Sequence, residues 1–194
     1  MTSNGHTRRG LALLHRLEAG LRRLGFNDYT LFLVLSGVVG LAAGMGVVLF
    51  RWTYEALTRL ALPGADGHSV VEVIRDRPAW SIIAAIAIGG LLVALIQKLA
   101  VGRQFHGVAQ AIDAVAFRGG RMPFRTTIVR FFTNALSIGA GGSVGPEGPV
   151  IELGSGLGSA HAQALGLSPE RMRTLVGAGA AAGLAAAFNL SLIH

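Results

Sequence analysis

Glu147 stands between two Gly-Pro pairs, in the sequence Gly145-Pro-Glu-Gly-Pro149, and it is the single charged residue between Arg130 and Glu152. A carboxylate in apolar surroundings is costly unless it has a partner or a task. An apolar segment that is interrupted by Gly and Pro and then resumes as helix is typical of a discontinuous membrane helix. Such irregular backbone persists at membrane depth only where it lines a cavity or is buried in protein.

The residues around Glu147 predict a helix N-terminus that attracts anions. Pro149 suits the first helical position, because its missing N–H would have no partner there. Free backbone donors and the helix dipole would then face an anion, through the amides of Glu147, Gly148, Val150 and Ile151. An ionised Glu147 could occupy the place of the anion, and a protonated or displaced one would vacate it. One side chain could therefore serve as gate and proton carrier; the alternative is that Glu147 only caps the helix dipole.

Composition places this chemistry in a membrane protein. The chain is 52% hydrophobic and 14% charged, whereas soluble domains carry about 25% charged residues. Its 194 residues include 28 glycines, which membrane helices tolerate because small residues let helices approach closely. Residues 31–50 and 79–96 are each long and apolar enough to span a bilayer. Residues 108–117 form a shorter apolar segment that suits a re-entrant helix.

The charges indicate topology. The net charge is +7, with a basic excess in residues 1–29 and 97–130 and a balance in residues 51–78. The positive-inside rule then puts the N-terminus and residues 97–130 in the cytoplasm and makes a nucleic-acid partner unnecessary. We therefore divide the chain into a cytoplasmic segment, 1–29, and a membrane domain, 30–194. The first segment has leucines at helical spacing and suits an amphipathic helix at the interface, or an ordinary surface helix.

Small residues dominate the last part of the chain. Ser168, Pro169 and Glu170 suit the N-cap and the first two positions of a helix. That helix continues through residues 177–188, GAGAAAGLAAAF, which are almost all small. Other helices must pack tightly against such a surface.

Two motifs together resemble the CLC family of chloride channels and chloride/proton antiporters. Residues 143–154, SVGPEGPVIELG, are similar to the family's Gly-Arg-Glu-Gly-Pro signature. Residues 177–189 are similar to its next small-residue helix, and the order of segments from residue 12 to 189 resembles the family's first seven helices. The resemblance implies an all-α polytopic membrane protein with re-entrant half-helices, forming the first repeat of a CLC-type inverted-repeat fold.

The resemblance also implies the site residues. Glu147 would be the gate and proton carrier for chloride. Residues 105–108 would form an anion-coordinating loop, with His106 at a position that often holds Ser or His in relatives; the alternative is a solvated loop histidine. The implied chloride-binding set is His106, Gly107, Val108, Gly145, Glu147, Gly148 and Val150.

Several residues depart from the family pattern. Ala109 and Gln110 replace the usual Pro-Glu, and Pro146 stands where Arg is common, which removes one donor and one charge. After Asn189 the sequence stops following the family, so we expect a chain that lacks the second repeat, the central tyrosine, the inner proton glutamate and the dimer helices.

These departures leave channel and antiporter both open. A homodimer in a bacterial cell membrane is what the resemblance implies for the full-length family. A truncated membrane fragment that transports nothing is the alternative.

Enzyme classes fit the sequence less well. Residues 174–183, TLVGAGAAAG, imitate the glycine fingerprint of a dinucleotide-binding fold, but that motif needs a preceding strand and a later acidic residue; no Asp or Glu follows Glu170. The chain has no Cys, and its histidines lack zinc-ligand spacing. Glu147 and Glu152 are five apart, on different helix faces rather than as a catalytic pair. We therefore expect no catalytic residues, cofactor or metal.

Overall fold

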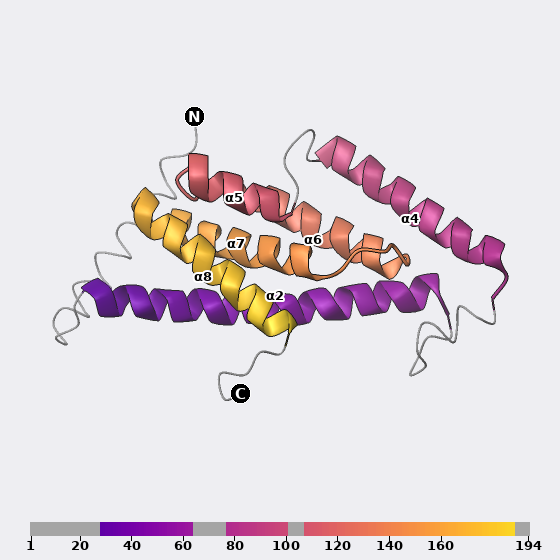
Figure 1. The fold of residues 1–194 in the computed structure, drawn as a ribbon, viewed down its shortest axis with the longest axis horizontal. Helices are drawn as coiled ribbons and strands as arrows, with labels where there is room; N and C mark the ends of the chain where they lie inside the picture. Colours follow the sequence, from indigo (N-terminus) through magenta and orange to yellow (C-terminus); the bar gives the residue numbers. More distant parts are fainter. Residues whose placement is uncertain (1–27, 64–76, 101–106, 189–194) are drawn as a thin grey trace.

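The computed structural model describes residues 28–63, 77–100 and 107–188, and the regular structure in them is entirely helical. The helices, in order, are α2 (Asp28–Ala61), α4 (Ala79–Ala100), α5 (Val108–Phe117), α6 (Phe124–Gly139), α7 (Glu147–Ala164) and α8 (Pro169–Ala187) (Figure 1). The all-α class predicted from the sequence is confirmed. His106 and the interfacial helix expected near the N-terminus lie outside the described residues.

Two of these helices are long and apolar enough to cross a membrane. They are Phe32–Ala61, within α2, and Ala79–Ala100, which is α4. Both predicted spans are confirmed, although α2 continues beyond the expected end at Phe50. Within this extension, Arg51 and Glu55 lie one helical turn apart, and an exposed ion pair joins Arg51 Nε to Glu55 Oε1 at 2.8 Å. Pairs at this spacing stabilise a helix. The short helix α5 has the bounds that the apolar segment predicts.

Helices α7 and α8 pack backbone against backbone. A Cβ added to Gly154 would collide with the carbonyl oxygen of Gly179, and one added to Gly158 would collide with that of Leu175. At Gly183 an added Cβ would lie 2.5 Å from the Val150 carbonyl oxygen. The small residues therefore sit where the two helices meet, as glycine-rich membrane helices do. Figure 1 shows α8 lying diagonally across α7 and α2.

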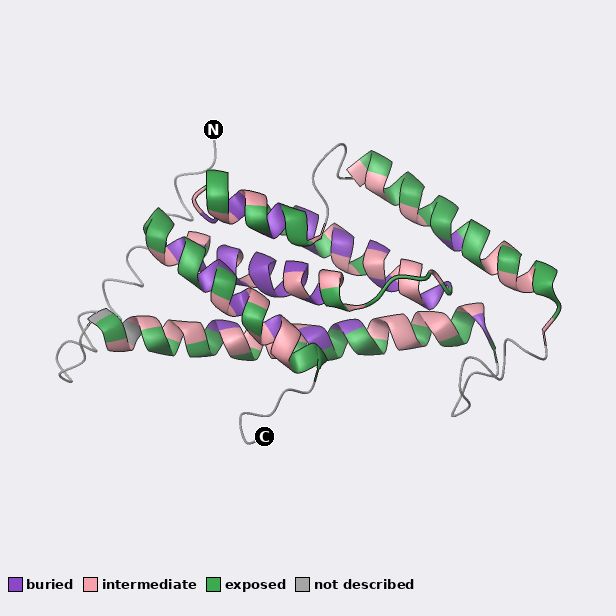
Figure 2. Cartoon of the chain, viewed as in Figure 1, coloured by how far each residue is buried: buried purple, intermediate pink, exposed green. Residues whose placement is uncertain are grey.

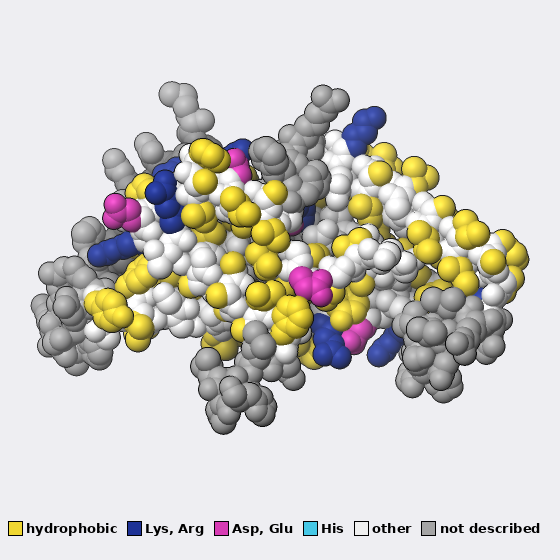
Figure 3. Space-filling model, in the orientation of Figure 1, with side chains coloured by type: hydrophobic (Ala, Val, Ile, Leu, Met, Phe, Trp, Pro, Cys, Tyr) yellow, Lys and Arg dark blue, Asp and Glu magenta, His cyan; other side chains and the backbone are white. Residues whose placement is uncertain are grey.

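Helix α7 is the centre of the core, whereas α4 lies at its edge. An apolar cluster joins α2, α6 and α7 through Val47, Phe50, Ala135, Val150 and Leu153. Figure 2 shows α7 largely buried and α4 largely exposed. The outer side chains of α4 are hydrophobic, and they contribute to the apolar surface in Figure 3. Such a surface suits a helix that faces lipid or other apolar partners.

The turn between α5 and α6 is fixed to α7 by hydrogen bonds. Ser159 Oγ donates to the Gly120 carbonyl at 2.6 Å and accepts from the Met122 amide at 2.8 Å. Gln163 Nε2 donates to the Met122 carbonyl at 2.9 Å. Gly120 has a φ of 82° and no room for a Cβ against Met172, so glycine is required there. These bonds hold α5 and α6 in place against α7.

Candidate functional site

The segment between α6 and α7 is an irregular chain of small residues that ends at Glu147. Helix α6 stops where Gly141 adopts a φ of 88°, which glycine accepts readily. The amides of Gly141 and Gly142 donate to the carbonyls of Ile138 and Ser137, at 3.0 and 2.9 Å, and so close the end of α6. Residues 143–145 are then exposed before α7 begins. The predicted interruption at the Gly and Pro residues is confirmed, but α6 and α7 lie side by side and antiparallel rather than forming one discontinuous helix (Figure 1).

Glu147 is the first residue of α7, and its side chain is exposed. Its carboxylate folds back over Gly145, since a Cβ added to Gly145 would collide with Glu147 Oε2. No side chain caps this helix start, and the N-cap position is held by Pro146. The carboxylate thus lies at the positive end of the helix dipole, where a negative charge is favoured.

The start of α7 differs from the prediction in its register. The helix begins at Glu147, so Pro149 occupies the third helical position and the expectation that it stands first is wrong. The amide of Val150 donates to the Pro146 carbonyl at 3.0 Å, so the prediction that this amide is free is wrong. Pro149 carries no N–H. The first-turn amides left for an anion are therefore those of Glu147 and Gly148, which have no hydrogen-bond partner within the described segments.

A second helix start lies at Gly107 and Val108. Gly107 is the N-cap of α5 with a φ of 62°, a conformation that side-chain-bearing residues rarely adopt, and no side chain caps the helix. Val108 is 39% exposed. The first turn closes through the Gln110 amide, which donates to the Gly107 carbonyl at 3.1 Å. This is the short half-helix that the sequence predicts.

A groove beside the start of α5 is bordered by the second and third turns of α7 and by α8. It has a volume of about 350 Å³ and is lined by Val108 of α5, Ile151 and Ser155 of α7, and Val176 and Ala180 of α8, among others. Its walls are almost wholly apolar, and the hydroxyl of Ser155 is buried there without a hydrogen-bond partner in the described part of the chain. The fold thus brings the start of α5 to the first half of α7, although the sequence separates Val108 from Ile151 by some 40 residues.

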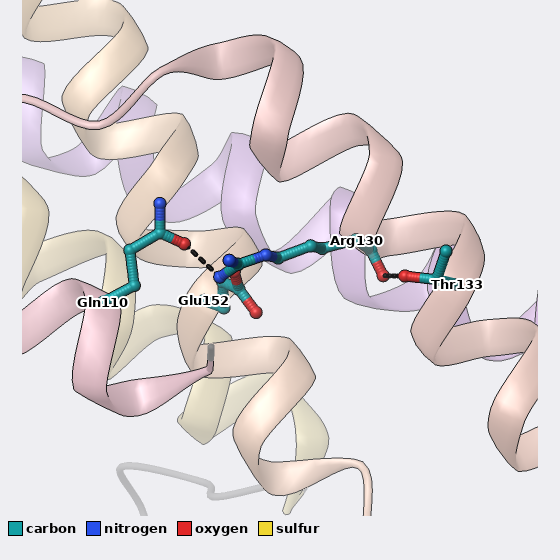
Figure 4. A network of polar contacts seen from close by, with 4 residues as sticks. All are labelled: Gln110, Arg130, Thr133 and Glu152. Atoms are coloured by element: carbon teal, nitrogen blue, oxygen red, sulfur yellow. Dashed lines mark hydrogen bonds and ion pairs between the residues drawn. The ribbon is translucent and has the colours of Figure 1, made fainter. Parts of the chain in front are cut away.

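A buried ionic network joins α5, α6 and α7 behind these helix starts. Arg130 and Glu152 are each 2% exposed, and Arg130 Nη1 lies 2.5 Å from Glu152 Oε1. The same Nη1 donates to Gln110 Oε1 on α5 (Figure 4). Breaking a buried pair of this kind by removing one partner is strongly destabilising, because the other charge is left uncompensated.

Comparison with known proteins gives a consistent result. The family profile described as "Voltage gated chloride channel" matches residues 82–193. The chain belongs to this family. A ClcB-like chloride channel protein of Ralstonia nicotianae is 34% identical over 166 residues, which cover 81% of this chain and 37% of that protein. Chloride channel protein CLC-e of Arabidopsis thaliana is 29% identical over 161 residues, covering 80% of this chain and 22% of that protein.

A solved structure of a slow cyanobacterial Cl⁻/H⁺ antiporter shares the fold. It superposes with a TM-score of 0.63 at 27% identity, covering 81% of this chain and 37% of that one. The chain therefore spans between 22% and 37% of the length of these relatives. The polytopic membrane fold implied by the resemblance is confirmed.

Membership of the chloride channel family also argues against the alternative that the protein is a dinucleotide-binding enzyme. Members of the family are channels or antiporters rather than enzymes. The glycine-rich residues 174–183 lie inside helix α8, so no strand precedes them and the dinucleotide-binding interpretation is wrong.

The buried network of Arg130, Glu152 and Gln110 was not predicted from the sequence. The charge pattern groups Arg130 with the basic cytoplasmic segment, yet this residue is buried in α6. Helical spacing puts Glu152 on a different face from Glu147, and the difference in their burial confirms this. One signal was available: an Arg and a Glu within apolar helices of a membrane protein almost always pair.

Proposed function

We propose that this protein moves chloride across a membrane along a path that passes the starts of α5 and α7, with Glu147 as the gate. The observation that carries the proposal is the placement of Glu147. Its carboxylate lies exposed at a helix start, folded over Gly145, beside the amides of Glu147 and Gly148. Relatives named as chloride channels and as a Cl⁻/H⁺ antiporter support chloride as the anion and a proton as its counterpart.

The gate would work by competition for the helix end. The ionised carboxylate and a chloride ion are attracted by the same dipole and the same donors, so they exclude each other. Protonation removes the charge of the carboxylate and favours its departure from the site. The Glu147 side chain is exposed and so can move toward solvent, and the missing Cβ of Gly145 leaves the space that the carboxylate occupies now. A side chain that alternates in this way can carry a proton as chloride passes.

The second set of donors would come from the start of α5. Gly107 and Val108 open that helix without a side-chain cap, and Val108 borders the groove shared with α7. His106 precedes them and belongs to the same proposed loop, although it lies outside the described residues. Two half-helix N-termini directed at one ion are the arrangement by which membrane transporters hold anions.

The setting we propose is a bacterial cell membrane. The basic excess of residues 1–29 and 97–130 supports a cytoplasmic N-terminus. The membrane domain begins at residue 30, and α2 and α4 provide two bilayer-spanning helices. We also propose a homodimer, because the family resemblance implies one for the full-length protein.

The proposal is tested by ion flux from liposomes. The protein expressed from its own gene is purified, reconstituted and loaded with chloride, and chloride efflux and proton uptake are recorded together. We expect chloride efflux, with coupled proton movement if the protein is an antiporter and without it if it is a channel. In an antiporter, Glu147→Gln should retain chloride flux and lose proton coupling. Glu170→Gln, an exposed carboxylate in the first turn of α8, is the matched control and should change neither. Absence of chloride flux in the unmodified protein would refute the proposal.

A further inference from the structure

The buried side chains of Arg130, Glu152 and Gln110 lie close to the proposed ion path without forming part of it. They come from three different helices, and Figure 4 shows Arg130 reaching from α6 toward both acceptors. Gln110 belongs to the first turn of α5, and Glu152 to the second turn of α7. The network therefore links the beginnings of the two helices that we propose to face chloride.

The geometry of the Arg130 contacts restricts how α5 and α7 can move relative to each other. A guanidinium is planar and presents several fixed donors, so its position is well defined when two acceptors hold it. Nη1 serves both acceptors here, with Glu152 Oε1 at 2.5 Å. Within α6, the backbone carbonyl of Arg130 accepts a hydrogen bond from Thr133 Oγ1 at 3.3 Å. A displacement of α5 against α7 would stretch a charge-assisted hydrogen bond in a buried setting, where such bonds are strong.

Arg130 also balances the negative charge of Glu152 near the start of α7. Helix α7 carries two carboxylates near its start, Glu147 and Glu152. Two unbalanced negative charges there would oppose the entry of an anion. Arg130 compensates Glu152 at close range, so the carboxylate left to compete with chloride is that of Glu147.

We infer that Arg130, held by Glu152 and Gln110, is a positioning residue for the chloride path: it fixes the start of α5 relative to that of α7 and cancels the charge of Glu152. This inference rests on the proposed function. It predicts that loosening the α5 side of the network alters how well chloride is bound more than how much protein folds.

Gln110→Leu is the decisive variant, because it removes the α5 acceptor and leaves the Arg130–Glu152 ion pair intact. Chloride efflux is measured over a series of chloride concentrations in liposomes. We expect the half-saturating chloride concentration to rise at least threefold while the maximal flux changes by less than twofold. Gln163→Leu is the matched control: it also deletes a glutamine that joins helix to turn, at the far end of α7, through Met122 and Ser159. It should lower the melting temperature and leave the half-saturating concentration unchanged.

A second variant keeps the inference testable if Gln110→Leu does not accumulate. Gln110→Met keeps the length of the buried side chain and removes only its acceptor for Arg130. We expect folded protein with flux and a half-saturating chloride concentration raised at least threefold. An unchanged half-saturating concentration in whichever variant folds would overturn the positioning role while leaving chloride transport standing. Absence of flux in the unmodified protein would instead remove the proposed function and this role with it.

Discussion

The two carboxylates of helix α7 lie five residues apart and have opposite surroundings. Glu147 is exposed at the first residue of the helix, and its carboxylate rests over Gly145. Glu152 is 2% exposed and is held by Arg130. The same chemical group is thus free to move at one end of a short segment and fixed a turn and a half later. The difference comes from the neighbouring helices, because α6 supplies a cation to the second position and an irregular chain precedes the first.

The rest of α7 continues this contrast. Residues 143–147 are largely exposed, whereas from Val150 to Ser159 nearly every residue is buried. The buried part meets α8 at glycines and α6 at Arg130 and Thr127. Helix α7 is thus packed along most of its length, and its exposed first turn carries the proposed gate.

The largest effect should follow from breaking the buried pair. Glu152→Ala leaves the Arg130 charge uncompensated in the core, so we expect a loss of about 3–5 kcal/mol in the free energy of unfolding, enough to abolish accumulation of a marginally stable protein. Detergent-solubilised yield and thermal melting measure it. The double variant Arg130→Met with Glu152→Leu should recover most of the stability, because apolar side chains of similar volume remove both charges. A Glu152→Ala protein as stable as the parent would show, contrary to our interpretation, that Glu152 is not held in the core by a stabilising ion pair.

A smaller loss should follow from crowding the α7–α8 contact. Gly154→Ala puts a methyl group against the Gly179 carbonyl, and overpacking of this kind costs about 1–3 kcal/mol in the free energy of unfolding. Gly177→Ala on α8 is the matched control, since a Cβ there would meet no atom within 4 Å. It should leave the melting temperature unchanged or raise it, because alanine favours helix. Equal melting temperatures for the two variants would show that the helices do not meet at these glycines.

Much of this fold could be predicted from the sequence. Apolar length predicts α2, α4 and α5, and the small residues of 177–188 predict that another helix packs closely on α8, which the structure shows to be α7. These predictions succeed because they depend only on the residue types within one segment, and not on its neighbours in space. The break before Glu147 was predictable for the same reason, because glycine and proline interrupt a helix.

The parts that could not be predicted depend on three-dimensional neighbours. The register of α7 escapes prediction because proline is acceptable in any position of the first turn, so its presence does not distinguish the first position from the third. The Arg130–Glu152–Gln110 network involves three helices, and no spacing in one helix reveals which residues of the others face it. Arg130 falls within the cytoplasmic charge excess by sequence because counting charges says nothing about burial.

The smallest effect on stability is expected at Glu147. Substituting this residue also tests the proposed gate most directly. Glu147→Gln removes an exposed charge with no partner in the described segments, so the melting temperature should stay close to that of the parent. Chloride flux from liposomes is then measured from neutral to acidic pH in both proteins. We predict that chloride flux through the parent rises as the Glu147 carboxylate becomes protonated, and that the Glu147→Gln protein conducts at all pH values without that rise. A variant that keeps the pH dependence of the parent would contradict the assignment of Glu147 as the gate.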